Sequence, residues 1–337
     1  MDARARAEEK RLPPALVITI DVEPDNEWGR PPPGTCHNIR PLEAFHERCR
    51  AQGITPTYLL SYGMVTDGEA LAGLARILVQ GGCEIGAHLH PWETPPFAYA
   101  DGADNGAHAF PHELPEELFE AKLATVTDAI VSRLGVRPVS YRAGRWGMSH
   151  RCLGPLIRQG YRVDTSVTPL YSWHRQVGLP NGDGGPAYLT APQDPYHPSP
   201  HDICLPGDSP LWEVPLTIGL PGPLSALRTR IHRVTGSRVL FSRVARRSGI
   251  LRLQWLQPTR GIGRTTEALC RLARHFVQRG APVLNMMFHS SELMEGGSPY
   301  HPTAVEVAEF ERRIWDTLSY ICTDLRARPV RLCESVA

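Results

Sequence analysis

Two pairs of side chains that bind metal ions well stand at alternate positions at the ends of apolar stretches. His88 and His90 end the run "CEIGAHLH", and Asp21 and Glu23 end the run "ALVITIDVE". Side chains two residues apart on a strand point to the same face, so each pair projects toward one point. Two imidazole nitrogens and one carboxylate oxygen are the ligand set of many catalytic zinc sites, which keep a further position open for water. The two pairs therefore predict a metal centre.

Three further strand ends carry side chains suited to acid–base chemistry: Arg142 in "YRAGRW", Asp164 in "VDTSVTP" and His289 in "MMFHSSE". A guanidinium beside a carboxylate base holds that base ionised and oriented. A carboxylate within reach of an imidazole fixes its tautomer and raises its pKa, as an acid catalyst requires. We therefore expect Arg142 to support a carboxylate base and Asp164 to orient a catalytic histidine.

Each of these residues also has a structural interpretation. A strand-end aspartate commonly caps a turn or a helix, an arginine can pair with a helix, and the two histidines could form a solvated turn before Pro91. Two buried carboxylates at Asp21 and Glu23 would be costly without a cation, however. The arrival of polar side chains at five separate strand ends favours the functional interpretation. Trp92 and Trp146 either stack on a sugar or cover the mouth of the fold, and the sequence does not separate these two roles.

The elements that would position these residues alternate between strand and helix patterns. A β-branched run at 15–23 predicts a buried strand, a pattern at 41–53 between a proline and a glycine predicts a helix, and 115–135 predicts a long helix. Roughly eight or nine strands with helices between them are typical of βα units around a parallel sheet. Functional sites in such folds lie at the carboxyl ends of the strands. The sequence therefore predicts an α/β fold, a single (β/α) barrel.

The expected organisation is an N-terminal tail (1–14) followed by one barrel domain (15–337). The barrel carries a long inserted loop rich in proline and glycine at 170–211, and a basic helical segment at 223–252. A loop of this length in a compact domain is usually functional or disordered. We expect the inserted loop to be functional, as a lid or a wall of the site.

The bulk composition excludes several classes of function. The 337 residues include 36 basic and 35 acidic side chains, a net charge of +1, which gives no reason to expect a nucleic-acid partner. The basic stretch at 228–252, within the segment at 223–252, is either a solvated helix face or a contact with an anionic substrate or a membrane surface. The sequence has no apolar run long enough to span a bilayer and no recognisable export signal, and its eight cysteines are dispersed. These features predict a cytoplasmic protein with reduced thiols.

The order of the motifs resembles that of the polysaccharide deacetylases of the NodB-homology type, carbohydrate esterase family four. "TIDVE" (19–23), "GAHLH" (86–90), "YRAGRWG" (141–147), "DTSVTP" (164–169) and "MMFHSSE" (286–292) look like the five motifs of that family. The resemblance covers nearly the whole chain and implies a distorted (β/α)7 barrel. Two spacings depart from the family pattern: its first motif has adjacent aspartates, and its two histidines are four residues apart, whereas position 92 is Trp here.

The resemblance also implies a role for each candidate residue. It assigns Asp21 as the catalytic base and Glu23, His88 and His90 as ligands of a divalent metal, with exchanged roles of the two carboxylates as the alternative. It further implies that His289 protonates the leaving amine. Zinc is the expected ion, and cobalt, nickel and manganese are alternatives. Tyr141, Trp92 and Trp146 are expected at the substrate, through their rings or through a backbone N–H near Tyr141 or Trp146.

The implied reaction is hydrolysis of an N-acyl group, most simply N-acetyl, on an amino sugar or glycan precursor. Two other functions stay open at this point. The chain could hydrolyse another C–N amide, such as a cyclic amide or ureide, with or without a metal. It could instead be a barrel that only binds carbohydrate, although binding alone has no use for the acid–base pair of Asp21 and His289.

Overall fold

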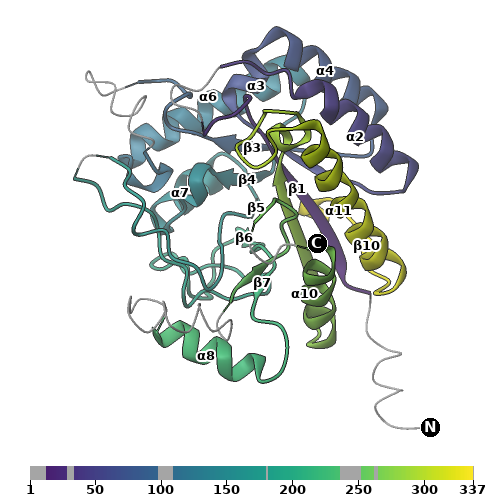
Figure 1. Ribbon diagram of the computed structural model, residues 1–337. Coiled ribbons are helices and arrows are strands. Elements are labelled where there is room, and N and C mark those ends of the chain that lie inside the picture. The colour runs from purple at the N-terminus through teal and green to yellow at the C-terminus, as the bar shows by residue number, and fades with distance from the viewer. Residues whose placement is uncertain are drawn as a thin grey trace.

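The centre of the molecule is a curled parallel β-sheet surrounded by helices (Figure 1). The computed structural model describes residues 13–28, 34–97, 109–179, 181–235, 252–261 and 265–336. The strands follow the order β10-β1-β2-β3-β4-β5-β6, and β9 also pairs with β1. Every ladder in this sheet is parallel. The predicted α/β class is therefore confirmed, and the sheet is that of a distorted (β/α) barrel.

The strands of the sheet differ in length, and β1, β9 and β3 are the longest. Their bounds are β1 Ala15–Val22, β2 Thr57–Leu60, β3 Glu84–Leu89, β4 Ser140–Ala143, β5 Val163–Asp164, β6 Trp212–Glu213, β7 Ile218–Gly219, β8 Gln254–Trp255, β9 Val283–His289 and β10 Arg328–Pro329. The helices are α2 Ile39–Ala51, α3 Tyr62–Thr66, α4 Gly68–Gln80, α6 Glu116–Leu134, α7 His150–Arg158, α8 Ser225–Thr235, α10 Thr266–Gln278 and α11 Ala304–Thr323. Short 3-10 turns follow two of the strands, at Gly144–Trp146 and Ser290–Leu293.

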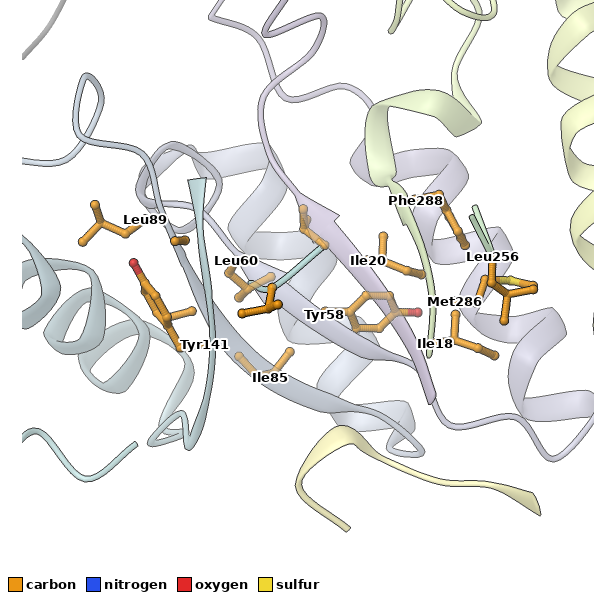
Figure 2. Packing of buried hydrophobic residues seen from close by; sticks show 14 of the residues in the cluster. Ile18, Ile20, Tyr58, Leu60, Ile85, Leu89, Tyr141, Leu256, Met286 and Phe288 are labelled. Atoms are coloured by element: carbon orange, nitrogen blue, oxygen red, sulfur yellow. The ribbon is translucent and has the colours of Figure 1, made fainter. Parts of the chain in front are cut away.

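Alternation along β1 separates the core from the site. Ile18 and Ile20 are buried and belong to the large apolar cluster that the helices complete (Figure 2). The intervening side chains, Thr19 and Asp21, face the interior of the barrel, where their partners are other strands. Because the side-chain period of a strand is two, one face of β1 packs on helices while the other carries polar groups.

The barrel is distorted on the side between β6 and β9, where no regular ladder joins the two strands. Irregular backbone closes this side: the N–H of Thr217 donates to the carbonyl of Asn285 at 3.2 Å, and the N–H of Met287 donates to the carbonyl of Leu256 at 3.2 Å. The Nδ2 of Asn285 donates to the Oγ1 of Thr165, at 2.8 Å. Backbone and side-chain hydrogen bonds thus replace the missing ladder and satisfy polar groups that burial would otherwise penalise.

The predicted segments have the following counterparts. Within the described residues of the long loop predicted at 170–211 there is no helix, and only isolated bridges, such as Ser172 with Ala187, give them regular structure. Its described part is ordered by backbone hydrogen bonds, for example from the Tyr188 N–H to the Tyr171 carbonyl. The first residues of the tail predicted at 1–14, and residues 236–251 of the basic segment, lie outside the described residues. Among the residues that are described, no helix is long and apolar enough to cross a membrane.

Candidate metal centre and active site

The register of the sheet brings the candidate residues together in two neighbouring pairs. Asp21 on β1 stands beside His289 on β9, and His88 on β3 stands beside Arg142 on β4. All four are at the carboxyl ends of their strands, which meet at one edge of a parallel sheet. Seven strand-end residues were predicted for the metal and the acid–base chemistry. Six of them share one site: Asp21, Glu23, His88, His90, Arg142 and His289. The seventh, Asp164, does not.

Glu23, His88 and His90 form a three-ligand cluster. One side-chain atom from each lies within 4.8 Å of the other two, and all three side chains are buried. The Nε2 of His90 is 3.5 Å from the Oε2 of Glu23, and the Nε2 of His88 is 3.7 Å from the same oxygen. Bonds of about 2.0–2.1 Å at a tetrahedral angle place two ligand atoms about 3.3–3.4 Å apart, so the cluster fits a zinc ion after small adjustments.

The hydrogen bond on the far side of His88 sets the ring in the form that a metal needs. Its Nδ1 lies 3.0 Å from the carbonyl oxygen of Arg142, which can only accept, so Nδ1 carries the proton. The lone pair of Nε2 then faces the oxygen of Glu23. Metal-ligating histidines commonly hold their tautomer in this way. The donor set and its outer hydrogen bond therefore both fit a divalent metal.

Asp21 is held by Arg142 rather than by the histidine pair. The Nη1 of Arg142 donates to the Oδ1 of Asp21 at 2.5 Å, and both side chains are buried. The rest of the guanidinium is fixed by Thr19, through Nη2 at 2.6 Å, and by the Thr165 carbonyl, through Nε at 3.0 Å. Burial opposes ionisation of Asp21, but the charges of Arg142, His88 and His289 outweigh it and keep the pKa of this carboxyl below its usual range.

The second oxygen of Asp21 faces the space between the histidines. Its Oδ2 lies 3.9 Å from the Nε2 of His88 and 3.9 Å from the Nε2 of His289. The arrangement leaves one oxygen of an ionised, buried carboxylate directed at the ligand cluster. Such an oxygen is suited to accept a proton from a group bound there.

The Nδ1 of His289 is held by Glu292, a residue to which the sequence analysis gave no role. This nitrogen lies 3.1 Å from the Oε1 of Glu292, and the same oxygen accepts the His289 backbone N–H, also at 3.1 Å. Thr259 donates to that oxygen at 3.0 Å. Burial disfavours protonation of the imidazole, but Glu23, Glu292 and Asp21 outweigh it and raise the pKa of His289 to about 9. A cation bound by Glu23 would weaken this effect, because it would neutralise part of the nearby negative charge.

The prediction that Asp164 orients His289 was wrong. Asp164 is in register with Tyr141 and therefore points to the outer face of the sheet, away from the site. Its carboxyl group accepts a hydrogen bond from the Oγ of Ser166 at 2.6 Å, and it stands in register with the buried Glu213 on β6. Burial raises the pKa of both carboxyl groups, which favours one proton shared between them. Glu292 takes the role that Asp164 was expected to have.

The prediction that the Tyr141 side chain contacts the substrate was wrong for the same reason. Tyr141 alternates with Arg142 on β4, so the two side chains lie on opposite faces. Its ring is fully buried and packs against Phe119 and Tyr161. Figure 2 shows Tyr141 among the buried hydrophobic residues of the core. Tyr141 is a core residue.

Aromatic side chains wall a cavity of about 450 Å³ above the cluster. Trp92 and Trp146 both line it, as predicted for residues at the mouth. Trp92 stacks on His90 with ring centroids 4.3 Å apart and donates from Nε1 to Glu27 at 3.1 Å. The Trp146 ring lies over the Arg142 guanidinium, and the Cζ of Arg142 is 5.1 Å from the centroid of that ring. The two tryptophans therefore also support the metal ligand and the arginine that they cover.

Several residues of the wall were not singled out from the sequence. The further aromatic residues that line the cavity are Trp28, Tyr171, Trp173, Trp255 and Tyr300. Two of them, Tyr171 and Trp173, come from the inserted loop, which was predicted to supply such a wall. Of the others, Trp255 is the last residue of β8, and Trp28 and Tyr300 follow β1 and β9 in positions that no periodic pattern marks. Only their place at or after strand ends could have indicated them.

Comparisons with known proteins agree with this fold. No family model matches the chain, and no curated protein matches its sequence. A solved structure described as a glycoside hydrolase/deacetylase from Parabacteroides distasonis matches with a TM-score of 0.58 and 12% identity, over 96% of this chain and 71% of that one. A second, described as a polysaccharide deacetylase from Mycobacterium smegmatis, is 17% identical over 94% of this chain and 92% of its own, with a TM-score of 0.45. The first likeness shows that this chain shares its fold with a structure of that class.

Proposed function

We propose that the protein is a metal-dependent hydrolase that removes an N-acyl group, most simply acetyl, from an amino sugar or a glycan precursor. One observation carries the proposal. The ligand cluster of Glu23, His88 and His90 lies between an ionised carboxylate held by an arginine and an imidazole held by a glutamate. Amide hydrolysis needs this combination: polarisation of the acyl carbon, a proton acceptor for water and a proton donor for the amine.

The residues of the site divide the proton transfers between them. Glu23, His88 and His90 would hold a divalent ion, zinc in the first place and cobalt, nickel or manganese as alternatives, which would supply polarisation of the acyl oxygen and acidification of water. Asp21, kept ionised by Arg142, takes a proton from the attacking water as the new C–O bond forms. His289, kept protonated by Glu292, gives a proton to the nitrogen as the C–N bond breaks. The products are a free amine and a carboxylic acid, acetate in the simplest case.

The aromatic wall favours a sugar as the part of the substrate that carries the amide. The rings of Trp146 and Trp173 are nearly parallel, at 17° and 6.4 Å between centroids, and Trp255 stands at 83° to Trp173. Flat aromatic faces suit the C–H-bearing faces of sugar rings, and concave aromatic sites with few polar groups are typical of small-molecule binding. Cyclic amides and ureides remain the alternative substrates, and a carbohydrate-binding barrel without catalysis remains the alternative function.

The direct test measures acetate release from a panel of N-acetylated amino sugars, with and without a chelator, together with the metal content of the protein. We expect release by the wild type, its loss with chelator and its recovery with zinc. Asp21→Asn should retain zinc and lose about 10²- to 10⁴-fold in kcat, because only the proton acceptor is removed. His88→Ala should lose zinc itself, whereas His150→Ala, an exposed histidine of α7, should keep both zinc and activity.

The outcomes separate the alternatives. Release of ammonia or ring opening from cyclic amides, with none from N-acetyl sugars, would point to the other C–N substrates. Protein that binds no metal and hydrolyses none of these compounds would reject the hydrolase. An Asp21→Asn variant with full activity would reject the assignment of the proton acceptor.

A further inference from the structure

The helix α8 (Ser225–Thr235) presents its apolar residues to solvent and its polar residues to the protein. Leu224, just before the helix, and Leu227, Ile231 and Val234 within it are 71%, 52%, 37% and 64% exposed. The only buried residue of α8 is a histidine, His232. A surface helix of a globular protein normally buries its apolar side and exposes its polar one, so α8 has the opposite arrangement.

Polar contacts fix which side of α8 faces the protein. The Nε2 of His232 donates to the carbonyl of Leu170 at 2.8 Å, and Arg233 donates to the carbonyl of Ala191 at 3.2 Å. At the start of the helix, the hydroxyl of Ser225 lies 3.0 Å from the Nε2 of His275 on α10. These contacts leave the apolar side outward, at the lower edge of the molecule in Figure 1.

The four apolar residues form one narrow stripe. At about 100° per residue, positions 227, 231 and 234 of the helix fall within about 60° of its circumference, and the exposed Leu224 directly precedes the helix. Arg230 borders the stripe on one side and Arg228 on the other. An apolar stripe between arginines is the pattern of helices that lie in the plane of a membrane interface.

The charge of this region is strongly one-sided. Residues 225–252 contain eight arginines and no acidic residue, whereas the rest of the chain has 28 basic and 35 acidic residues, a net charge of −7. A segment of this charge on an otherwise acidic molecule would orient it with α8 toward an anionic surface. Phosphodiester backbones would satisfy the charge but would leave the apolar stripe in water, whereas an anionic bilayer satisfies both.

We propose that α8 is the contact of this protein with an anionic membrane surface. The helix lies along the bilayer, and its stripe of Leu224, Leu227, Ile231 and Val234 enters the boundary between headgroups and acyl chains. Arg230, the exposed arginine of α8, faces the anionic headgroups. Leu170, which His232 contacts, directly precedes Tyr171 of the cavity wall, so the docking helix is joined to the wall of the candidate active site.

Vesicle sedimentation of the full-length protein tests this proposal without reference to enzymatic activity. The probes are vesicles of phosphatidylcholine with about 30 mol% phosphatidylserine and vesicles of phosphatidylcholine alone. We expect binding to the anionic vesicles, weakened by added salt, and little binding to the neutral ones. The double variant Leu227→Gln/Val234→Gln should bind about tenfold or more weakly, because two inserted side chains are lost. Arg230→Glu should also bind about tenfold or more weakly. One arginine near the surface contributes about fivefold to the affinity for anionic lipid, and the substitution both removes this attraction and adds a repulsive charge.

Matched variants control for surface polarity and charge. Val79→Gln/Val305→Gln removes two valines that are 89% and 69% exposed on α4 and α11, and Arg133→Glu reverses an exposed charge on α6. Both should bind vesicles like the wild type, and circular dichroism should show all variants folded. No binding to anionic vesicles, equal binding to neutral ones, or unchanged binding of the α8 variants would overturn the proposal. Dimers that form without lipid and disappear in Leu227→Gln/Val234→Gln would also overturn it, and would identify the stripe as a protein interface.

Discussion

The two ring nitrogens of His289 face different carboxylates, and this division decides what the residue can do. Nδ1 is hydrogen-bonded to Glu292, so Nε2 is the nitrogen directed at Asp21 and Glu23. Glu292 is fully buried and also accepts a hydrogen bond from the Thr259 hydroxyl, which fixes the position of its carboxylate. Glu292 is therefore a positioning residue that acts through His289.

Substitution of Glu292 should impair the chemical step more than substrate binding. In Glu292→Ala the imidazole loses the acceptor that orients it and the charge that favours its protonated form, so we expect kcat to fall about 10- to 100-fold with KM changed little. The alkaline limb of the pH–activity profile, where His289 loses its proton, should also move to lower pH, because Glu292 is one of the groups that raise the pKa of His289. Steady-state kinetics across pH measure both effects.

Asp164→Asn is the matched control for this experiment, because Asp164 was the carboxylate expected from the sequence at this position. It has no contact with His289, and an amide can donate to Glu213 in place of the shared proton. Its kcat should stay within about threefold of the wild type. A large loss in Asp164→Asn with none in Glu292→Ala would contradict the assignment.

The types of the residues and their places at strand ends predicted most of the site. The two wrong predictions, for the Tyr141 ring and for Asp164, are explained by the direction of their side chains. Asp21, Glu23, His88, His90, Arg142 and His289 were predicted at one rim, and they meet there. Arg142 and Tyr141 are adjacent on a strand and cannot face the same side, so placing Arg142 inward already excluded the Tyr141 ring. Asp164 could not be excluded in this way, because its direction depends on its pairing with Tyr141, which only the register between β4 and β5 determines.

At the scale of elements, the ends of β3 and β4 approach each other more closely than a side chain would allow. Gly144 directly follows β4, and a Cβ added there would overlap the His90 ring and come within 2.6 Å of the Leu89 carbonyl. The glycine lets the turn Gly144–Trp146 pass against the metal-ligand strand. The turn itself places Arg145 and Trp146 at positive φ, 52° and 63°, in the left-handed region that non-glycine residues seldom adopt.

Gly144→Ala should therefore weaken metal binding specifically. The added methyl group pushes the His90 ring away from Glu23, and a displaced ligand should cost about 10- to 100-fold in zinc affinity, as loss of a supporting contact does at other metal sites. Competition with a chromogenic zinc chelator measures this affinity directly. Gly68→Ala is the control, because a Cβ there meets open space at the start of α4 and should leave zinc affinity unchanged. Equal affinities in the two variants would show that the close approach has no part in holding His90.

The strand-and-helix alternation was predictable because each element has its own periodic signal, whereas the closure of the barrel was not. β5 and β6 each extend over two residues, and the region between β6 and β9 is closed by Thr217, Leu256 and Asn285 through hydrogen bonds of irregular backbone. Such contacts follow from the shape of the assembled sheet and leave no pattern in the chain. The cytoplasmic location expected from the sequence stays a prediction.

At the scale of the whole molecule, a pair of buried carboxyl groups couples stability to pH. Asp164 on β5 and Glu213 on β6 are in register and fully buried, and one oxygen of each, Asp164 Oδ2 and Glu213 Oε2, has no hydrogen-bond partner among the described residues. A proton on one of the two groups avoids burying two like charges side by side. Burial raises the pKa of both groups, and the charge of Asp164 raises the pKa of Glu213 further. The folded protein therefore keeps a proton that the unfolded chain releases once the pH exceeds about 4.5.

The sign of the effect follows from this raised pKa. The contribution of the pair to stability is complete below about pH 4.5 and is lost as the pH rises toward the pKa of Glu213 in the folded state. One retained proton corresponds to a loss of about 1.4 kcal/mol per pH unit within this window. In Glu213→Gln an amide N–H can donate to Asp164, and no titrating proton is needed. The unfolding free energy of the variant minus that of the wild type should therefore increase as the pH is raised.

Denaturant unfolding at about pH 4.5, 6 and 7.5 measures this difference, and the subtraction of one protein from the other cancels the titration of all groups that they share. Glu117→Gln, an exposed acid on α6, controls for the removal of a carboxyl group and should run parallel to the wild type. If Glu213→Gln also ran parallel, the pair would hold no extra proton, and two ionised carboxylates would have to coexist beside Arg142. Since the strands β5 and β6 are joined over only two residue pairs, a repulsive pair at this point would weaken the sheet where it is already shortest.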